Sequence, residues 1–406
     1  MDLEQTYKLI GILAGIVFLY TLIAKRVESS FISGPIVYVT IGLILGTKGL
    51  DVVGELTDAN DLRFLADITL ALILFSDAAH SNIAVLKQKL FYPKRMLLIG
   101  LPGAILLGCI VAAVLLDVLS ILEAAILGTI LGATDAALGK AVITNQKVPA
   151  EIREGLNVES GLNDGLCVPV LLLLLAIATS QSHEALSTLE TLAIFVEELG
   201  IGLIVGLSIA YVGATLLKWC AKKNGLSEVW LQLTVGAIAL CCFGVTQTLH
   251  GSGYVASFSG GLLFGYLANK HTHELVLTTE SIAELLAMLT WILFGAAVVG
   301  EIYGEFTISM LVYALLSLTF VRMLPIYLSY LGTNVPAKQR LFMGWFGPRG
   351  LASIVFTIIL LDANLENGDF VALTVALTVL ASLILHGITA KPFANLISQN
   401  RDSDLK

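Results

Sequence analysis

The sequence predicts an all-α protein that crosses a membrane many times. Of its 406 residues, 57% are hydrophobic and only 13% are charged, against roughly 25% charged in ordinary soluble domains. Apolar runs recur from end to end, and a helix of about 20 such residues crosses a hydrocarbon core of roughly 30 Å. We therefore expect one membrane unit over residues 1–406, surrounded by the lipid bilayer. The formal charge of -8 gives no indication of a nucleic-acid partner, and we expect none.

Thirteen apolar runs, separated by polar connections, are each interpreted as one transmembrane helix. The first run lacks a basic start and a small-residue cleavage site, so it is expected to be a retained helix and not a signal peptide. The expected helices cover residues 6–24, 34–47, 64–79, 96–116, 121–143, 154–179, 189–217, 229–249, 253–269, 281–300, 306–330, 341–361 and 369–390.

Lysine and arginine fall mainly at alternate connections between these runs. The positive-inside rule places such connections in the cytoplasm. The amino terminus is then outside the cell (inner) membrane and the carboxyl terminus is cytoplasmic, in agreement with an odd number of helices. The basic residues of the cytoplasmic side are Lys25, Arg26, Lys87, Lys89, Lys94, Arg95, Lys147, Arg153, Lys218, Lys222, Lys223, Lys270, Lys338, Arg340, Lys391, Arg401 and Lys406.

An internal repeat relates the two halves of the chain. TIGLILG (40–46) resembles SGGLLFG (259–265), and ILFSDAA (73–79) resembles ILFGAAV (292–298), both at an offset of 219 residues. Seven spans separate equivalent helices, so the second copy is inverted in the membrane, as in many transporters. The alternative is that glycine and leucine simply recur, as they do in any membrane protein.

The expected repeats are residues 6–179 and 229–390, with six helices each, joined by a linking helix over 189–217. In inverted-repeat transporters, discontinuous helices cross near the membrane midplane, and their free backbone groups face the binding site. We expect these breaks at Thr134 and Asp135 in the first copy and at GPRG (347–350) in the second.

Charged side chains inside the expected helices are costly, at least about 2.5 kcal/mol each, so they persist mainly where they pair or line a water path. Within 154–179, Glu159 and Asn163 are four residues apart, as are Ser160 and Asp164. The two pairs form neighbouring polar stripes about 100° apart on the helix, so one stripe can be structural while the other binds ions. The charged candidates are Asp77, Asp135, Glu159, Asp164 and Arg349.

Arg349 needs a carboxylate partner because a buried guanidinium does not lose its proton. We assign Glu159 as this partner, with Asn163 beside it on the same stripe. The other stripe then faces a cavity whose carboxylate, hydroxyl and backbone oxygens suit Na⁺. The residues assigned to this transported cation are Asp164, Asp135, Thr134 and Ser160, and Asp77 can add a carboxylate directly or through water.

Burial and nearby negative charges both raise the pKa of a carboxylic acid, so such a group holds a proton or a metal cation but rarely both. The cavity therefore suits exchange of one ion for the other, without a cofactor. A sodium-coupled symporter of a small organic solute is the alternative, but it needs polar groups for a second ligand, and few are present. Two residues also have structural alternatives: Asp77 could end a helix beside a loop, and Asp135 could cap a half-helix.

The motifs ATD (133–135), ESGLNDG (159–165), ALILFSDA (71–78) and GPRGLAS (347–353) resemble the NhaP-type Na⁺/H⁺ antiporters, the electroneutral branch of the monovalent cation:proton antiporters. The resemblance covers nearly the whole chain. It implies a thirteen-helix homodimer in which an ion-binding core domain moves against a dimerisation domain, and a transporter rather than an enzyme. Ala136 and Asp77 depart from the family, which often has proline and glutamate at these positions.

The same resemblance implies roles for individual residues. Asp164 is then the carboxylate that binds the cation, and Thr134, Ser160 and Asp135 assist it. Glu159 and Arg349 form a structural pair next to Asn163. Because the electrogenic relatives carry aspartate where this chain has Asn163, the resemblance favours one-for-one exchange of Na⁺, with Li⁺ and K⁺ as alternatives, for H⁺.

Overall fold

The computed structural model describes residues 3–29, 34–47, 49–52, 59–80, 91–135, 138, 142, 145, 148–183, 188–223, 225, 227–268, 272–299 and 306–403. Every regular element in these ranges is helical. The helices of the first half are α1 (Leu3–Ser29), α2 (Gly34–Leu45), α3 (Ala59–His80), α5 (Phe91–Arg95), the π-helical turn η2 (Met96–Gly100), α6 (Leu101–Leu115), α7 (Ile121–Ile130), α9 (Ala150–His183) and α10 (Thr188–Lys222).

The helices of the second half follow the expected order, with two clear differences in their bounds. The last helix, expected to end at residue 390, continues to Ser403. The helix expected to begin at residue 281 begins at Thr272. The segment THELVLTTE is too polar to be counted in the apolar run, but its residues still form the first turns of the helix. The elements are α11 (Glu228–Thr248), α12 (Gly253–Ala268), α13 (Thr272–Leu293), η4 (Phe294–Val299), α15 (Ile308–Leu316), η5 (Ser317–Val321), α16 (Arg322–Ser329), α17 (Ala337–Trp345), α18 (Leu351–Asp362) and α19 (Gly368–Ser403).

Eight helices in the described part of the chain are long and apolar enough to cross a membrane. Three further apolar helices are shorter, namely α2, α7 and α18. With a rise of about 1.5 Å per residue, α7 and α18 each reach only roughly half of a 30 Å hydrocarbon core. The protein is therefore an all-helical, multi-span membrane protein in which some helices do not cross alone.

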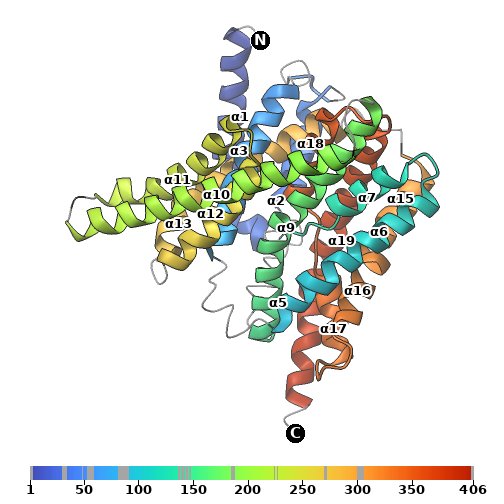
Figure 1. The fold of residues 1–406 in the computed structure, drawn as a ribbon. Helices are drawn as coiled ribbons and strands as arrows, with labels where there is room; N and C mark the ends of the chain where they lie inside the picture. Colours follow the sequence, from blue (N-terminus) through green and yellow to red (C-terminus); the bar gives the residue numbers. More distant parts are fainter. Residues whose placement is uncertain are drawn as a thin grey trace.

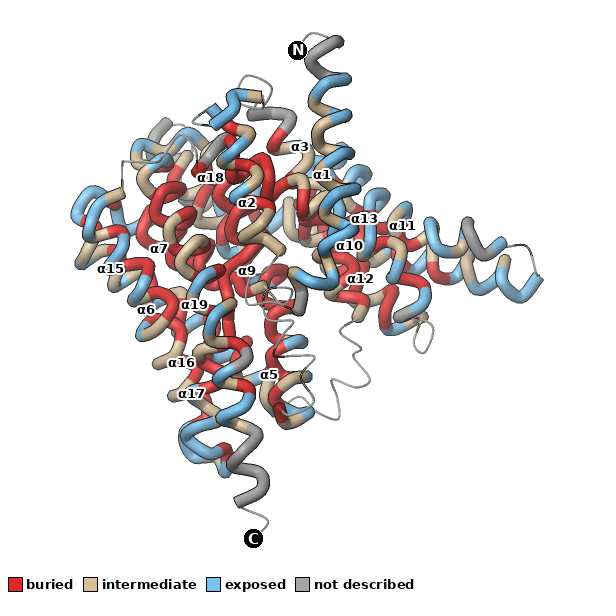
Figure 2. The backbone as a smooth tube through the Cα atoms, turned by 180° about the vertical axis from the view of Figure 1, so that it is seen from behind, coloured by how far each residue is buried: buried red, intermediate tan, exposed pale blue. Residues whose placement is uncertain are grey.

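The helices pack into two groups (Figure 1). The first, called the flanking group, contains α1, α2, α3 and α10 to α13. The second, called the crossover group, contains α5, α6, α7, α9 and α15 to α19. The groups meet where α9 packs against α10, α12 and α3, and where α18 packs against α3. Buried residues are concentrated along this central region, and exposed residues lie toward the ends and outer faces (Figure 2).

Glycines let two pairs of helices in the flanking group approach closely. A Cβ atom at Gly42 of α2 would lie 2.1 Å from the carbonyl oxygen of Ile292, on α13. A Cβ atom at Gly261 of α12 would lie 2.3 Å from the carbonyl oxygen of Phe75, on α3. Membrane helices commonly pack through small residues in this way. TIGLILG thus packs against ILFGAAV, and SGGLLFG packs against ILFSDAA.

Two helices of the crossover group are interrupted in the regions where the sequence predicted breaks. The chain leaves helical geometry after α7 and is non-helical from 131 to 135, and it is non-helical again from 346 to 350, between α17 and α18. The two segments contact each other, because the backbone N–H of Asp135 donates to the carbonyl oxygen of Pro348 at 2.8 Å. Each segment therefore supplies part of the other's hydrogen bonding.

An ion pair joins the two groups at one end of α18. Arg63 of α3 donates a hydrogen bond through Nη1 to Asp362, the last residue of α18. Its Nε lies 3.5 Å from Oδ1 of Asp67, one turn along α3. The hydroxyl of Tyr254, on α12, donates to the same oxygen of Asp67 at 2.5 Å. Arg63 therefore has one carboxylate partner in each group.

Candidate ion-binding site

Glu159 on α9 and Arg322 at the start of α16 form a buried ion pair. Arg322 Nη1 donates to Glu159 Oε1 at 2.8 Å, and Arg322 Nη2 donates to Oε2 at 3.0 Å. Both residues are only 1% exposed, so each charge depends on this two-bond contact. The π-helical turn η5 immediately precedes Arg322, and such turns often occur at functional sites.

The expected pairing of Arg349 with Glu159 is therefore wrong. Arg349 instead donates through Nη1 to the carbonyl oxygens of Gly132 at 3.3 Å and Ala133 at 3.1 Å. These carbonyls follow the end of α7, where the helix dipole is negative and acceptors lack helical partners. A guanidinium can satisfy this demand without a carboxylate, because it carries five donors. Arg349 is thus a cap for the interrupted helix.

Arg322 is the residue that the sequence analysis missed, although a signal was available. It is the only charged residue between 306 and 330, in the middle of an apolar run long enough to cross the membrane. A charge in the middle of a membrane-spanning run needs a buried partner, and this holds for Arg322 as much as for Arg349.

Thr134 connects the two polar stripes of α9. Asn163 Nδ2 donates to Thr134 Oγ1 and also lies 3.4 Å from Glu159 Oε1. Ser160 Oγ donates to the carbonyl oxygen of Thr134 at 2.7 Å. The hydroxyl of Thr134 faces Oε2 of Glu159 at 3.5 Å. The side chain of Thr134 therefore belongs to the ion-pair network, while its carbonyl faces the stripe of Ser160 and Asp164.

Asp164 is buried, with only 6% of its surface exposed. Its Oδ1 atom has no hydrogen-bond partner among the residues that the structure describes. The charges of Asp135, Asp77 and Glu159 all act on this carboxylate. A buried polar atom without a partner usually indicates a bound water or ion, or a functional role. Asp164 is thus the carboxylate of this cluster that has an oxygen left to bind an ion or a proton.

Asp135 has the structural role that was its alternative interpretation. Its Oδ2 accepts a hydrogen bond from the backbone N–H of Leu351 at 3.1 Å, at the first residue of α18. A carboxylate there satisfies a free amide and interacts favourably with the positive end of the helix dipole. A Cβ atom at Gly350 would lie 1.9 Å from this same oxygen, so glycine is required there. Asp135 therefore caps α18 from the opposite segment.

Asp77 reaches the cluster from the flanking group, near the end of α3. Its charge interacts with those of Asp135 and Asp164. It also interacts with His80, the last residue of α3, and with Glu280 on α13. His80 Nδ1 lies 3.0 Å from Glu280 Oε1. The charges of Asp77, Asp135 and Asp164 thus act on one another, in the region where the two groups of helices meet.

The atoms of this cluster that could bind a cation are oxygens of carboxylates, hydroxyls and a carbonyl, which suit hard cations such as Na⁺. Within the described residues, no group of three or more His, Cys, Asp or Glu residues could hold a resident metal. The residues of the cluster are Asp164, Asp135, Thr134, Ser160 and Asp77.

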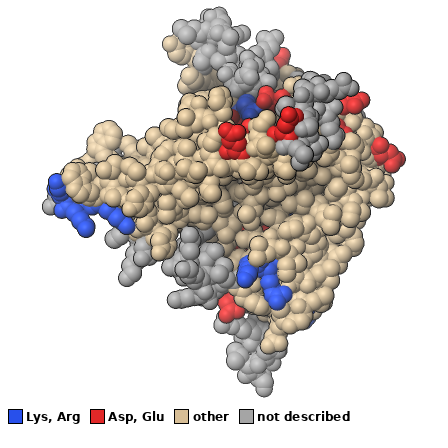
Figure 3. All heavy atoms as spheres, in the orientation of Figure 1, with Lys and Arg blue, Asp and Glu red and all other residues tan. Residues whose placement is uncertain are grey.

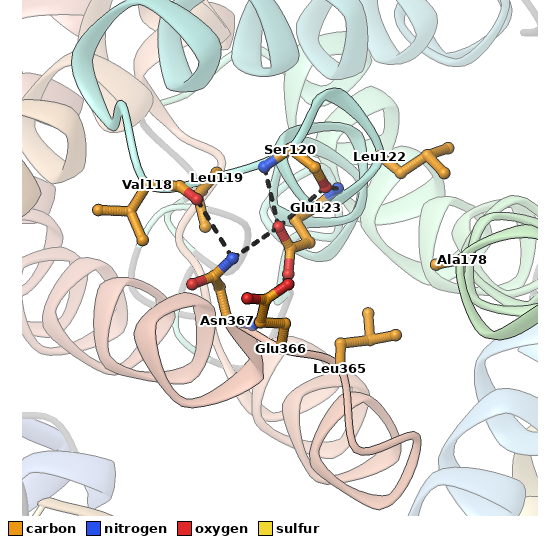
Figure 4. A pocket seen from close by; sticks show the side chains of 9 residues that line it. All are labelled: Val118, Leu119, Ser120, Leu122, Glu123, Ala178, Leu365, Glu366 and Asn367. Carbon is orange, nitrogen blue, oxygen red and sulfur yellow. Dashed lines mark hydrogen bonds between the residues drawn. The ribbon is translucent and has the colours of Figure 1, made fainter. Parts of the chain in front are cut away.

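A second carboxylate, Glu123, lines a cavity of about 630 Å³ away from this cluster (Figure 4). Its Oε2 accepts from the N–H and hydroxyl of Ser120 at 2.8 Å each, and its Oε1 accepts from the backbone N–H of Asn367 at 3.0 Å. These bonds tie the start of α7 to the start of α19. The spacing of Ser120 and Glu123 is that of a capping box, which could have predicted this role.

Comparison with known proteins identifies the group to which this arrangement is related. The model of the family described as "Sodium/hydrogen exchanger, transmembrane" matches residues 13–396. The solved structure of the sodium proton antiporter MjNhaP1 from Methanocaldococcus jannaschii at pH 8 superimposes with a TM-score of 0.79. It is 21% identical and covers 97% of this chain and 99% of that one, which shows a shared fold.

Curated relatives agree with the resemblance found in the motifs. The K(+)/H(+) antiporter NhaP of Alkalimonas amylolytica is 26% identical over 395 residues, which are 94% of this chain and 65% of the relative. NhaP2 of Shewanella sp. strain ANA-3, also a K(+)/H(+) antiporter, is 24% identical over 97% of this chain and 67% of its own length. Na(+)/H(+) antiporter 2 of Zygosaccharomyces rouxii is 26% identical over 380 residues, which are 89% of this chain and 46% of that protein. The chain thus spans about two thirds of the length of the first two relatives.

Replacing Glu159 by glutamine should destabilise the protein, because Arg322 would keep a buried charge without its partner. Breaking a buried ion pair costs about 3 to 5 kcal/mol. Adding Arg322→Gln should restore much of the melting temperature in detergent, whereas adding Arg349→Gln to Glu159→Gln should not. Equal recovery by both second substitutions would contradict the pairing described above.

Replacing Gly350 by alanine should slow transport strongly, since the new Cβ would overlap Oδ2 of Asp135 and displace the α18 cap. Overpacking of this kind costs about 1 to 3 kcal/mol, roughly a 5- to 150-fold effect if it acts on the transport step. Gly244→Ala on α11 is the matched control, because nothing lies within 4 Å of its added Cβ. Initial rates in proteoliposomes should fall for the first variant only, and similar rates for both would argue against this contact.

Proposed function

Because the chain belongs to the sodium/hydrogen exchanger family, we propose that it is a secondary active antiporter that exchanges a monovalent cation for H⁺. The single observation that carries the proposal is Asp164: it is buried, one of its oxygens has no partner in the described structure, and other carboxylates act on it. A site of this kind attracts a cation or a proton. The family match favours antiport over symport of an organic solute.

In the proposed mechanism, the cation and the proton compete for Asp164. The cation is bound by Asp164 together with oxygens of Asp135, Thr134 and Ser160, and Asp77 contributes from the flanking group. When the cation leaves, a proton takes its place on the carboxylate. Glu159 does not compete in this way, because both of its oxygens are held by Arg322. The structural stripe thus leaves Asp164 as the exchanging group.

The proposal includes thirteen transmembrane helices in two inverted repeats, over residues 6–179 and 229–390, joined by the linking helix over 189–217. Two features support it. Glycines at equivalent positions, Gly42 and Gly261, pack against the helix of the opposite half. The non-helical segments after α7 and before α18 hydrogen-bond to each other, as expected for discontinuous helices that cross near the midplane.

We further propose that the crossover group is the ion-binding core and the flanking group is the dimerisation domain of a homodimer, as the family resemblance implies. Asp77 on one group and Asp164 on the other meet at the boundary, so a relative movement of the groups would change access to the cation. The contact of Arg63 with Asp362 crosses the same boundary. Arg63 keeps a second carboxylate partner, Asp67, if the two groups separate at this contact.

The proposed location is the cell (inner) membrane, with the amino terminus outside and the carboxyl terminus in the cytoplasm. The two termini lie at opposite ends of the molecule, which supports an odd number of crossings (Figure 1). On the face seen in Figure 3, the visible Asp and Glu lie mostly near the amino-terminal end, whereas the visible Lys and Arg lie mostly at the left edge and lower on the molecule, with residues of other kinds over most of the surface between them. This distribution supports the positive-inside assignment.

The cation is proposed to be Na⁺, and K⁺ is the second candidate because two of the relatives above are named K(+)/H(+) antiporters. The deciding experiment imposes a pH gradient on proteoliposomes, adds Na⁺, K⁺ or Li⁺ in turn at two pH values, and follows the internal pH. Exchange requires a pH change upon cation addition, with an apparent affinity that weakens at the lower pH. A cation that causes no pH change is not a substrate.

Replacing Asp164 by asparagine should abolish exchange, because the amide keeps the size of the side chain but cannot hold a proton or attract a cation as a carboxylate does. The variant should retain a melting temperature close to that of the wild type, since Asp164 is not part of the Glu159–Arg322 pair. Proton flux on cation addition is the measurement. Persistent exchange by this variant would rule out Asp164 as the shared site.

Exchange should be electroneutral, because one carboxylate is proposed to carry either ion and its neighbour Asn163 is uncharged. Clamping the membrane potential with valinomycin and K⁺ should leave the rate and the final gradient of Na⁺/H⁺ exchange unchanged. If the final gradient instead follows the imposed potential, each cycle moves net charge across the membrane and the exchange is not electroneutral.

A further inference from the structure

We propose that Ser382 and His386, on α19, are positioning residues of the exchange reaction. They hold the non-helical segment before α18 in the place from which it contacts Asp135. This inference rests on the proposed function, because Asp135 is proposed there as a cation ligand. Neither residue contacts Asp164 in any hydrogen bond of the described structure, so both would act through the backbone of the segment.

A directed chain of hydrogen bonds connects the two ends of this segment. The backbone N–H of Arg349 donates to Ser382 Oγ at 2.8 Å. Ser382 Oγ lies 3.1 Å from Nδ1 of His386, and Nε2 of His386 lies 2.9 Å from the carbonyl oxygen of Trp345. The chain thus starts at Arg349, passes through two side chains of α19 and ends at the last residue of α17.

The chemistry of the two ends determines the direction of the chain. The carbonyl of Trp345 can only accept, so Nε2 of His386 must carry a hydrogen. The N–H of Arg349 can only donate, so the hydroxyl hydrogen of Ser382 is free to point to Nδ1, which accepts in the neutral ring. Nδ1 also lies 3.0 Å from the carbonyl oxygen of Ser382, but a carbonyl can only accept, so the bond to an unprotonated Nδ1 comes from the hydroxyl. One tautomer of neutral His386 therefore satisfies both ends.

The opposite side of the segment has little room for displacement. A Cβ atom at Gly347 would lie 2.1 Å from Arg322 Nε, and one at Gly350 would lie 1.9 Å from Asp135 Oδ2. The carbonyl oxygen of Pro348 accepts the N–H of Asp135 at 2.8 Å. The segment is therefore held between the ion-pair network and the carboxylate cap on one side and α19 on the other.

Ser382 and His386 are four residues apart, so they lie on the same face of α19. Thr389 continues this face and accepts a hydrogen bond from Trp345 Nε1 at 2.9 Å. The rings of Trp345 and His386 also lie against each other, with centroids 5.1 Å apart. Ser382 and His386 are 0% and 3% exposed, so water cannot easily replace their bonds to the segment.

Loss of either bond should shift the segment and with it the carboxylate of Asp135. The exchanging group Asp164 would remain, so the apparent affinity for the cation should fall more than the maximal rate. A role limited to stability would lower the amount of active protein without changing the apparent KM. A change in the apparent KM itself, whatever happens to the maximal rate, therefore separates positioning from general support.

The test compares Ser382→Ala, His386→Leu, His386→Gln and the control Thr378→Val in proteoliposomes, with Na⁺ and K⁺ as the added cations. Thr378 is a buried residue of the same helix whose hydroxyl donates only to the carbonyl of Thr374 in the described structure, so it matches Ser382 without contacting the segment. Ser382→Ala and His386→Leu should raise the apparent KM about fivefold, the usual effect of losing one hydrogen bond. His386→Gln should recover most of the affinity, because its amide can donate to Trp345.

The cation concentration that half-maximally raises the melting temperature gives a second measurement, which does not require transport. It should shift by a similar factor in the same variants. An unchanged KM and midpoint in Ser382→Ala and His386→Leu, or equal shifts in Thr378→Val, would overturn the inference while the wild type still exchanges ions. Absence of cation/H⁺ exchange in the wild type would overturn the proposed function and this inference together.

Discussion

The structure depends on satisfying the backbone groups that two interrupted helices leave free inside a membrane protein. Lipid offers no hydrogen bonds, so non-helical backbone at that depth must find partners within the protein. Arg349 donates to the carbonyls after α7, and Asp135 accepts from the first amide of α18. The two segments also bond directly, from the N–H of Asp135 to the carbonyl oxygen of Pro348. Ser353 adds a further bond, from its hydroxyl to the carbonyl oxygen of Ile130 at 3.0 Å. Thr134, Asp135 and Arg349 of the candidate site lie in these two segments.

Satisfying the backbone uses charged residues, and their pairing determines which charge remains available. Arg349 donates to backbone carbonyls, and Glu159 forms its ion pair with Arg322, on another helix. Asp135 is committed partly to the start of α18. Asp164 is left as a buried carboxylate with an unpartnered oxygen, one turn from the ion pair. The proposed ion exchange follows from this division, because a group already held by two strong bonds cannot release and rebind an ion at low cost.

The boundary between the two groups of helices gives the site its position in the molecule. Asp77 is carried by α3 of the flanking group, whereas Asp164 and Asp135 belong to the crossover group. Glycine-mediated contacts hold α2 against α13 and α12 against α3, so the flanking group is tightly packed internally. The contacts that cross the boundary include an ion pair of Arg63 that has a second carboxylate partner within its own group. This arrangement suits movement of one group against the other, as in the proposed mechanism.

The helical, multi-span class of the protein and the breaks near Thr134 and Gly350 were predictable from the sequence. The nearness of Ser160 to Thr134 was predictable too, whereas Arg322 was missed. Hydropathy and spacing along one helix are local properties, so composition and periodicity report them directly. The partner of Glu159 was not predictable with the same security, because Arg322 and Arg349 both lie in buried regions and only the packing of α9 against the segments near η5 and α17 decides between them. The capping role of Asp135 and the chain through Ser382 and His386 likewise depend on contacts between residues more than thirty positions apart. The sequence by itself determined which charged side chains lie within apolar segments, and the cost of burying a charge means that each of them needs a partner. Only the tertiary structure decided which of these side chains are partners. Hydrogen bonds form over about 3 Å, and separation along the sequence does not give distances in space.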